Sequence, residues 1–403
     1  MNRRIFFLSS AAALAQAAQP SEQVVLGVIG SGSRGTFVMG VFQKDPALRV
    51  GAICDVYEPN LERAVSAASK VPGTHPKIYR NYNPKIYRNY KELLADKDVQ
   101  AVLIATPEHW HYQMVMDALA AGKDVYVEKP LCHTPEQGVK LVEAEKHTKS
   151  IIQVGMQRRS YDLYQQGREV VASGKLGTVR MVRSWWLNNY LGRTPHKLDG
   201  KLNWEQWQGP APHRPFDPQR FREWRYYSDY AGGILADQGA HVFDGIHMLM
   251  GAGYPSAVNA SGGKPHLAGV DMPESVVAIA EYPEDFLGVF TINYAAMQYK
   301  MANDQLNQLD GDRARMDIGR ENFKVYLKGA EDAPAMEMKS PKGFGWATDL
   351  HVQNFLECVR TRKPPAAPMR IAFQAALVVQ MANMSIKQGR RLKWNAALQR
   401  VEA

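Results

Sequence analysis

Short apolar runs alternate with helix-compatible segments along the first part of the chain. Five of these runs have the length of a buried strand: Val24–Ile29, Val50–Cys54, Ala101–Ala105, Val125–Val127 and Ile151–Val154. Strands that are apolar throughout and are separated by helices are typical of a parallel sheet covered on both faces. The pattern therefore predicts a doubly wound α/β domain over about 22–157.

The pattern changes after about residue 160. Val179–Leu187 is expected to be a strand, and Ser275–Glu281 and Leu287–Tyr294 have the composition of antiparallel strands. Two helices are expected near the end, over about 347–361 and 369–388. Together these elements predict a second domain of the α+β class over 158–395, with a substantial and mostly antiparallel sheet.

A glycine-rich turn follows the first predicted strand and opens a helix-compatible segment. Gly30, Gly32 and Gly35 have the spacing GxGxxG. In this motif the first glycine makes the tight turn, the second lets the backbone approach a pyrophosphate, and the third lets the helix lie close to the strand. The whole loop is expected to contact a dinucleotide: Gly30, Ser31, Gly32, Ser33, Arg34 and Gly35.

The second predicted strand ends at Asp55, twenty residues after Gly35. An acidic residue at this place binds the ribose hydroxyls of the adenosine and repels a 2′-phosphate, which favours NAD over NADP. Arg34 argues for NADP, because a nearby arginine can accommodate that phosphate. We expect NAD, with NADP as the alternative. A solvated carboxylate at a strand end is the other interpretation of Asp55.

Polar side chains also follow the remaining predicted strands. Ligands of doubly wound sheets bind beyond the carboxyl ends of the strands. The residues expected to contact the cofactor at this edge are Thr106, Pro107, His109, His111, Glu128, Lys129 and Gln157. For His109, packing in the core or at the surface is an equally good interpretation.

The segment ILADQGAHVFDGIH (234–247) places carboxylates and imidazoles among small and apolar residues. In a helix, Asp237, His241 and Asp244 would share one face. Such a face could hold a metal ion, handle protons, or form a buried polar cluster without chemistry. A metal site would need further ligands, for which the candidates are Asp244, His247, His109 and His111. No metal-binding spacing is met, and a carboxylate close to an imidazole fits an acid–base pair.

Composition and charge limit the class of protein. The length of 403 residues favours two domains, and a content of 45% hydrophobic and 22% charged residues is ordinary for a globular protein. The net charge of +9 is spread along the chain, which suits anionic ligands but does not by itself indicate nucleic acid. Three distant cysteines exclude both a disulfide framework and a CxxC metal pattern.

The first residues have the layout of an export signal. Arg3 and Arg4 precede an apolar run that is too short to span a bilayer, and small-x-small cleavage sites follow. The arginine pair is similar to a twin-arginine signal. We expect a signal over 1–18 and a periplasmic or exported protein without membrane insertion. A frayed extension on a cytoplasmic protein is the alternative.

An eight-residue direct repeat lies within the first domain, with PKIYRNYN at 76–83 and PKIYRNYK at 84–91. Interleaved basic and aromatic residues also occur where proteins stack single-stranded nucleic acid. One duplication is not a repeat architecture, however, so a lengthened surface loop is expected and no nucleic-acid partner.

Four motifs, in this order, resemble the Gfo/Idh/MocA oxidoreductases, a family of sugar and cyclitol dehydrogenases. They are Gly30-x-Gly32-x-x-Gly35, Thr106-Pro107 with His111, Glu128-Lys129-Pro130, and Asp237-x-x-x-His241. The resemblance extends over about 24–395. Within the family, the chain is similar to exported bacterial branches. It implies a Rossmann domain and a second domain whose large open sheet joins homodimers or homotetramers. One departure is Glu108, where many members have asparagine.

The resemblance also implies roles for the site residues. His241 would be the base for a sugar hydroxyl, Lys129 the cation beside the forming alkoxide, and Asp237 the group that orients the imidazole. Asp244 is expected behind them as a hydrogen-bond acceptor, and His247 in the packing. Further candidates for contact with a sugar are Arg159, Trp186 and Trp224. Because a periplasm supplies no free NAD, an exported dehydrogenase would carry its cofactor tightly bound.

Two other functions stay open. One is an NAD-dependent glycosidase that acts by transient oxidation and elimination, and the other is a non-enzymatic NAD-binding sensor. Glycosidase relatives usually lack Glu-Lys-Pro, and a sensor would be expected to have lost Lys129 and His241. Since all of these residues are present, the sequence favours a dehydrogenase, although the fold alone could not separate the three.

Overall fold

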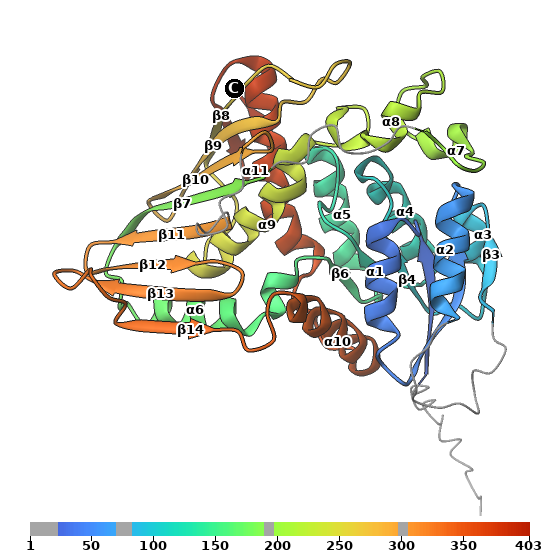
Figure 1. Ribbon diagram of the computed structural model, residues 1–403, viewed down its shortest axis with the longest axis horizontal. Helices are drawn as coiled ribbons and strands as arrows, with labels where there is room; N and C mark the ends of the chain where they lie inside the picture. Colours follow the sequence, from blue (N-terminus) through green and yellow to red (C-terminus); the bar gives the residue numbers. More distant parts are fainter. Residues whose placement is uncertain (1–22, 70–82, 189–196, 297–304) are drawn as a thin grey trace, which may run out of the picture.

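The computed structural model describes residues 23–69, 83–188, 197–296 and 305–403. The segment 1–18, expected to be an export signal, lies outside the described residues, as does the first copy of the direct repeat except for Asn83. Within the described ranges, two sheets stand side by side with helices between them (Figure 1). A search of these ranges found no helix with the length and apolar character needed to cross a membrane.

The first domain is a six-stranded parallel sheet with the order β3-β2-β1-β4-β5-β6. Its strands are β1 (Val24–Ile29), β2 (Leu48–Cys54), β3 (Lys85–Tyr87), β4 (Ala101–Ile104), β5 (Asp124–Val127) and β6 (Ile152–Val154). Its helices are α1 (Ser33–Phe42), α2 (Glu58–Ala68), α3 (Tyr90–Ala95), α4 (Glu108–Ala120) and α5 (Pro135–His147). The predicted doubly wound fold is confirmed. Four of the strands are buried along their whole length, as their apolar sequences require: β1, β4, β5 and β6.

The second domain contains a ten-stranded sheet with the order β14-β13-β12-β11-β7-β10-β9-β8-β15-β16. Its pairs are antiparallel except for β7 with β10, so the expected mostly antiparallel sheet is confirmed. The strands are β7 (Val179–Leu187), β8 (Ala257–Gly262), β9 (Ser275–Tyr282), β10 (Phe286–Asn293), β11 (Gln305–Gly311), β12 (Ala314–Ile318), β13 (Asn322–Leu327), β14 (Met336–Lys339), β15 (Leu392–Asn395) and β16 (Arg400–Glu402).

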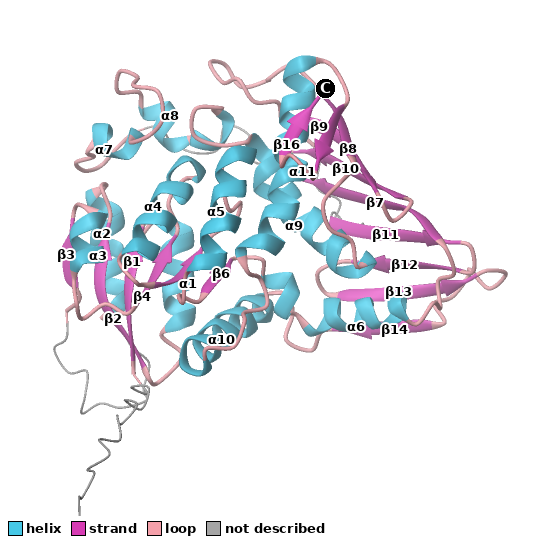
Figure 2. Cartoon of the chain, turned by 180° about the vertical axis from the view of Figure 1, so that it is seen from behind, coloured by secondary structure: helices cyan, strands magenta, loops and turns pink. Residues whose placement is uncertain are grey.

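Helices fill the space between the two sheets. From α6 (Asp162–Ala172) the chain reaches α9 (Gly233–Met250) and finally α11 (Met369–Gln388), which packs on both α9 and α5. Figures 1 and 2 show α5, α9 and α11 between the sheets from opposite sides. Because α9 is covered from both domains, nearly all of its residues are buried. The helix that carries Asp237 and His241 is therefore held at the junction of the domains.

One helix of the second half belongs to the core of the first domain. Helix α10 (Gly345–Thr361) lies against α1, where the ring of Phe355 meets those of Phe42 and Tyr126 edge to face, with centroids 5.8 Å apart in each case. Arg360 also forms a bidentate ion pair with Asp45, at 2.8 and 2.9 Å. A division of the chain at residue 157 therefore leaves out a helix that completes the dinucleotide domain.

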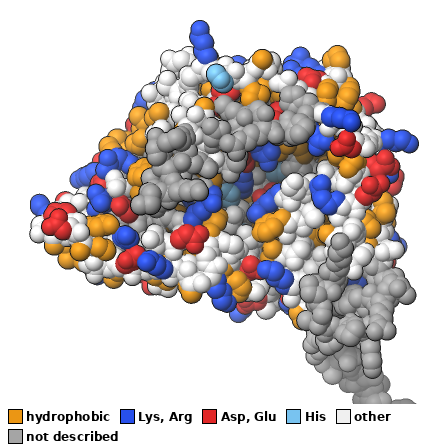
Figure 3. All heavy atoms as spheres, in the orientation of Figure 1, with side chains coloured by type: hydrophobic (Ala, Val, Ile, Leu, Met, Phe, Trp, Pro, Cys, Tyr) orange, Lys and Arg blue, Asp and Glu red, His pale blue; other side chains and the backbone are white. Residues whose placement is uncertain are grey.

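An aromatic segment crosses the open edge of the first sheet. It contains α7 (Trp204–Gln208), α8 (Pro218–Arg222) and the 3₁₀ helix η2 (Trp224–Tyr226). Its rings form a separate apolar cluster against Tyr57 of the first domain, and the buried members of that cluster are Tyr57, Trp207, Ala211, Phe221, Tyr227 and Tyr230. We call residues 198–230 the cap. Figure 3 shows Lys, Arg and His side chains in a hollow in the middle of one face of the molecule.

Two glycines of α1 are expected to respond oppositely to alanine. A Cβ at Gly35 would lie 2.0 Å from the carbonyl oxygen of Gly30, so we expect Gly35→Ala to cost about 2 kcal/mol or more of stability. A Cβ at Gly40 would meet no atom within 4 Å, so Gly40→Ala is expected to stabilise the helix by about 0.5–1 kcal/mol. Urea denaturation of both variants measures this difference. Equal stabilities would contradict the close approach of α1 to the glycine turn.

Candidate active site

The glycine turn after β1 is shaped to receive a phosphate group. Gly30 has a positive φ of 83°, which side chains disfavour, and a Cβ there would lie 2.8 Å from the backbone nitrogen of Thr106. Gly32 caps α1, and the space beside it is open, since only Asn60 Nδ2 comes within 4 Å of an added Cβ. The free N–H groups at the start of α1 thus face open space, as pyrophosphate binding requires.

Asp55 lies directly beside this turn. Its Oδ2 accepts hydrogen bonds from Ser31 N at 2.7 Å and from Ser31 Oγ at 3.1 Å, and its Oδ1 accepts one from Tyr57 N at 2.9 Å. Burial raises the pKa of Asp55, although these hydrogen bonds oppose the shift. The carboxylate is 8% exposed, so the alternative of a solvated strand-end residue is wrong. Ser31 is fully buried and supports the turn through Asp55.

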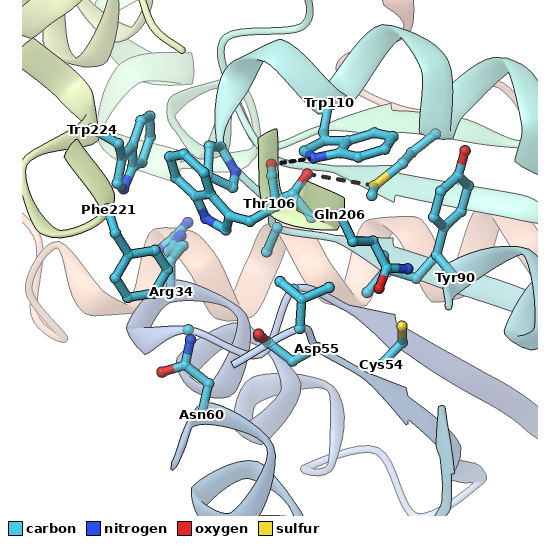
Figure 4. A pocket seen from close by; sticks show the side chains of 18 of the residues that line it. Arg34, Cys54, Asp55, Asn60, Tyr90, Thr106, Trp110, Gln206, Phe221 and Trp224 are labelled. Atoms are coloured by element: carbon cyan, nitrogen blue, oxygen red, sulfur yellow. Dashed lines mark hydrogen bonds between the residues drawn. The ribbon is translucent and has the colours of Figure 1, made fainter. Parts of the chain in front are cut away.

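A first cavity of about 360 Å³ extends from the glycine turn to the cap. Figure 4 shows Asp55 and Asn60 at one side of it, with the rings of Trp110, Phe221 and Trp224 around the rest. Seven of the expected cofactor residues line it: Gly30, Gly32, Ser33, Arg34, Asp55, Thr106 and Pro107. Arg34 donates from Nε to Glu128 Oε1 at 2.8 Å, so its ion pair is with Glu128.

A second cavity of about 350 Å³ continues from the first, since both are lined by Arg34, Thr106 and Trp224. The other expected residues that it brings together are His111, Glu128, Lys129, Gln157, Trp186, Asp237 and His241. They come from the carboxyl edge of the first sheet, from the 3₁₀ helix η1 (Gln157–Ser160), from β7 and from α9. Both domains therefore contribute to this second cavity.

Lys129 and Asp237 form a direct ion pair across the domain junction. Lys129 Nζ donates to Asp237 Oδ1 and to the main-chain oxygen of Asp237, each at 2.6 Å. Asp237 Oδ2 accepts from Gln238 Nε2 at 2.9 Å and lies 3.6 Å from Arg225 Nε. Burial would raise the pKa of Asp237, but the charges of Lys129 and Arg225 outweigh it and lower that pKa to about 2. The Asp237 carboxylate thus binds Lys129 and Gln238. It had been expected to orient the imidazole of His241 instead.

His241 lies one helical turn after Asp237 and lines the same cavity. Burial, followed by the positive charges of Lys129 and Arg158, lowers the pKa of His241 well below its ordinary value. The imidazole is therefore neutral at pH 7 and can accept a proton. Arg158 Nη1 donates to the main-chain oxygen of His241 at 3.0 Å and fixes this turn of α9.

Four expected ligand contacts line neither of these two cavities: Ser31, Gly35, His109 and Arg159. His109 is buried beneath the cap, with Nε2 3.0 Å from the carbonyl oxygen of Trp207, and lines neither cavity. Arg159 donates to Asp244 Oδ1 at 2.6 Å and borders a different hollow. Gly35 supports the turn from within α1. Gln157 lines the second cavity and Arg159 does not, because neighbouring positions of a helix point to different faces.

The remaining histidines have structural partners. His111 Nδ1 lies 2.7 Å from Pro130 O, and its Nε2 lies 2.9 Å from Thr106 O, so this ring connects the two loops that carry the motifs. His247 Nε2 lies 2.8 Å from the hydroxyl of Tyr282, in the packing as expected. Among the described residues, no three side chains of His, Cys, Asp or Glu come together as a metal site.

Several residues of the second cavity were not predicted from the sequence. They are Glu108, Arg225, Gln238, Arg320 and Phe344. Arg158, which also lines this cavity, had a signal in the sequence, because it follows a predicted strand end beside Gln157. Arg320 had none, because it belongs to the short turn between β12 and β13.

Glu108 is a buried carboxyl group at the start of α4. It is 3% exposed, and its Oε2 accepts a hydrogen bond from Gly232 N at 2.9 Å, at the cap of α9. Burial raises the pKa of Glu108 to about 8, with the Asp237 charge adding to the shift. Glu108 is thus largely protonated at neutral pH and joins the two domains as an uncharged acid.

Glu108→Gln is expected to make stability less dependent on pH. A carboxyl whose pKa is raised by folding stabilises the protein at low pH, and this contribution is lost as the pH rises towards about 8. The loss is on the order of 3–5 kcal/mol for wild type, whereas glutamine keeps the acceptor and has no such loss. The melting-temperature difference between variant and wild type should therefore grow between pH 5 and 8. Glu357→Gln, at an exposed residue, is the control, and a pH-independent difference for Glu108→Gln would contradict the assignment.

Protein-family profiles match both domains. The profile described as an oxidoreductase family with an NAD-binding Rossmann fold, Gfo/Idh/MocA, matches residues 24–156. The Gfo/Idh/MocA C-terminal domain profile matches residues 164–317. The first half is thus the NAD-binding Rossmann fold of this family.

Known proteins agree with the family profiles. Inositol 2-dehydrogenase of Corynebacterium glutamicum is 32% identical over 174 residues, which is 43% of this chain and 48% of that protein. Glycosyl hydrolase family 109 protein 1 of Shewanella is 33% identical over 127 residues, 32% of this chain and 27% of that protein. The chain thus spans about half and about a quarter of these relatives. A solved levoglucosan dehydrogenase complex with NADH and levoglucosan has a TM-score of 0.72 at 18% identity, covering 92% of this chain and 99% of that one, and so has the same fold.

Proposed function

Because this chain belongs to the Gfo/Idh/MocA family of oxidoreductases, we propose that it transfers a hydride between a hydroxyl or carbonyl carbon of a sugar or cyclitol and NAD. The observation that carries the proposal is the meeting of Lys129, Asp237 and His241 in a cavity that continues from the glycine turn. The relatives named inositol 2-dehydrogenase and levoglucosan dehydrogenase support a carbohydrate substrate.

Three residues that line the second cavity would each have a role in the reaction. The neutral His241 accepts the hydroxyl proton of the substrate, and the ammonium group of Lys129 stabilises the negative charge that develops on the oxygen. Asp237 holds that ammonium group in place through its carboxylate and its main-chain oxygen. The glycine turn would hold NAD, which would supply the hydride acceptor. The glycine turn and Asp55 fit this cofactor, because a side chain at Gly30 or Gly35 would collide with the backbone or side chains around the turn.

We also propose that the cofactor is tightly bound. The cap and the glycine turn line the same cavity from opposite sides, so a dinucleotide there would be enclosed by Trp207, Phe221 and Trp224. Export of the chain with its cofactor loaded, as the segment 1–18 suggests, would require such retention. Acid denaturation of the purified protein should then release close to one NAD(H) per chain, measured by chromatography. Protein that is folded but free of nucleotide after mild purification would contradict tight retention.

A panel of sugars and polyols tests the reaction itself. Turnover is followed by the absorbance of reduced nicotinamide, both with added NAD and with the bound cofactor and an external carbonyl acceptor. We expect oxidation of at least one polyhydroxylated ring. Absence of hydride transfer with every compound of the panel would contradict the proposal.

The glycosidase alternative is favoured by one observation, the likeness to the family 109 glycosyl hydrolase over 127 residues. It predicts release of the aglycone from aryl glycosides without net formation of NADH. We propose the dehydrogenase as the main function, because Lys129 is paired with Asp237 and its side chain is 12% exposed, at the site where a developing alkoxide needs a cation. Association through the open face of the ten-stranded sheet into a homodimer or homotetramer is a further proposal, which light scattering can test.

A further inference from the structure

The second cavity has an excess of cationic side chains. Five cations line it: Arg34, Lys129, Arg158, Arg225 and Arg320. Three carboxyl groups line it as well: Glu108, Glu128 and Asp237. Two of these acids already have partners, since Glu128 pairs with Arg34 and Asp237 with Lys129. An excess of positive charge in a cavity favours a ligand that carries negative charge.

Arg158 is the cation whose environment points most clearly to an anion. It is 4% exposed, and its Nη1 donates to a main-chain oxygen of α9. Its guanidinium lies 5.2 Å from the ring centroid of Tyr164 and 6.0 Å from that of Phe344. Among the described residues, Nε has no hydrogen-bond partner and no carboxylate lies within ion-pair distance. The nearby buried Asp244 is bound to Arg159 instead. A buried cation without a counter-charge is costly, so a bound anion would stabilise it.

Arg320 reaches the same part of the cavity from the turn between β12 and β13. Its guanidinium carbon lies 5.3 Å from the ring centroid of Phe344 and 5.2 Å from that of Trp186. Arg158 and Arg320 therefore both stand against Phe344, although they come from η1 and from the far sheet. Arg320 Nε donates to Gln305 Oε1 at 2.5 Å. Guanidinium groups that reach one cavity from two elements can each bind an oxygen of a carboxylate.

The cofactor does not account for this pair of arginines. Gly30 and Gly32, where a pyrophosphate is expected, line the first cavity, whereas Arg158 and Arg320 line only the second. Trp186 Nε1 and Gln157 Oε1 line the same cavity and are buried without a hydrogen-bond partner among the described residues. The polar groups of the second cavity thus suit a ligand with hydroxyl groups and one anionic end.

We propose that the substrate is an acidic sugar, whose carboxylate is bound by Arg158 and Arg320 while its reacting hydroxyl lies at His241 and Lys129. This inference rests on the proposed function and names the substrate class of the same site. The proposal commits to a carboxylate, whose two oxygens guanidinium groups bind in a planar, bidentate way. We call Arg158 and Arg320 the clamp.

Binding to the cofactor-loaded protein tests the assignment directly. Calorimetry compares D-glucuronate, D-galacturonate and D-mannuronate with the corresponding neutral hexoses, and includes glucose 6-phosphate. We expect at least one acid to bind 10-fold or more tightly than its neutral partner, with a preference that weakens as salt is added. Equal or weaker binding of all three acids, or a preference for the phosphate over the acids, would overturn the proposal.

Substitutions of the two arginines test whether they cause the preference for an acidic sugar over a neutral one. Arg320→Gln and Arg158→Gln should each lower the ratio of acid to neutral affinity by about 10-fold or more, the usual effect of losing a hydrogen bond to a charged group. Arg320→Lys keeps the charge without the planar fork and should recover only part of the ratio. Lys146→Gln removes an exposed cation of α5 and should leave the ratio unchanged. Because Arg320 is exposed, its variants are expected to fold, and an unchanged ratio in Arg320→Gln would overturn the clamp.

The two proposals fail in different ways. Preferential binding of an acid without any hydride transfer would contradict the dehydrogenase and leave the clamp supported. Turnover of neutral sugars without any preference for acids would contradict the clamp and leave the dehydrogenase supported.

Discussion

Lys129→Met is expected to lower kcat for the sugar substrate by about 10²–10⁴-fold, because the cation beside the developing alkoxide is lost. The affinity for NAD should change little, since the glycine turn and Asp55 lie in the first cavity. Single-turnover reduction of the bound cofactor measures the chemical step separately from release. Lys146→Gln, which removes an exposed lysine of α5, is the control for loss of charge. A kcat within a few-fold of wild type would show that Lys129 does not stabilise the reacting oxygen.

The same substitution should also destabilise the fold, for a different reason. Asp237, whose side chain is 16% exposed, would keep its charge with Arg225 3.6 Å away, and breaking a buried ion pair costs up to about 3–5 kcal/mol. Lys129→Met combined with Asp237→Asn removes both charges and should recover most of the melting temperature, but none of the activity. A double variant as unstable as the single one would mean that the pair does not act as a unit. This comparison separates the catalytic role of Lys129 from its structural role.

His241→Asn is expected to reduce kcat/KM by about 10²–10⁴-fold, because His111, the other imidazole that lines the cavity, is held between the carbonyl oxygens of Pro130 and Thr106. The wild-type pH profile should carry a second signature. A base works in its unprotonated form, and the pKa of His241 is lowered well below its ordinary value by burial and by the surrounding cations. The rate of alcohol oxidation should therefore not fall as the pH drops from 8 to about 6.5, the unperturbed value for histidine.

The pH profile of kcat/KM for the wild type and for His241→Asn tests this role. An acid limb centred near pH 6.5 in the wild type, absent in the variant, would mean that the imidazole titrates as in water and that the surrounding cations do not act on it. His247→Asn, which alters a histidine packed on Tyr282, is the control for a change inside α9. It should affect stability more than the shape of the profile.

The parts of the fold that could be predicted from the sequence are those in which the local pattern and the final environment agree. β1 and β7 have the expected bounds, and the other strands of the first sheet that were expected lie within two residues of prediction. The strands that were missed have another character. β14 reads Met-Glu-Met-Lys at the outer edge of the ten-stranded sheet, where pairing with β13 decides the conformation. Strand propensity is weak in such segments, so neighbours rather than sequence determine them.

In the candidate site, too, the local pattern predicted some features, whereas contacts between distant segments determined others. The spacing of Asp237 and His241 on one helix predicted that both would lie at one face, and both line the second cavity. The partner of Asp237 could not be predicted, because Lys129 lies on a loop of the other domain, 108 positions away. Arg320 was missed for a similar reason, since a charged residue in a turn has the pattern of a solvated loop. Only the order of strands in the sheet brings it to Phe344.

Helix α10 is synthesised long after the other elements of the first domain, into which it packs. During synthesis, the six strands and five helices of the dinucleotide domain leave the ribosome long before α10 does. Until then Phe42 and Tyr126 lack the aromatic partner that covers them. The nascent domain therefore has an exposed apolar face while strands β7 to β14 of the second sheet are being translated. A chaperone that binds apolar surface would have its longest opportunity at this stage, and binding should end when Phe355 docks.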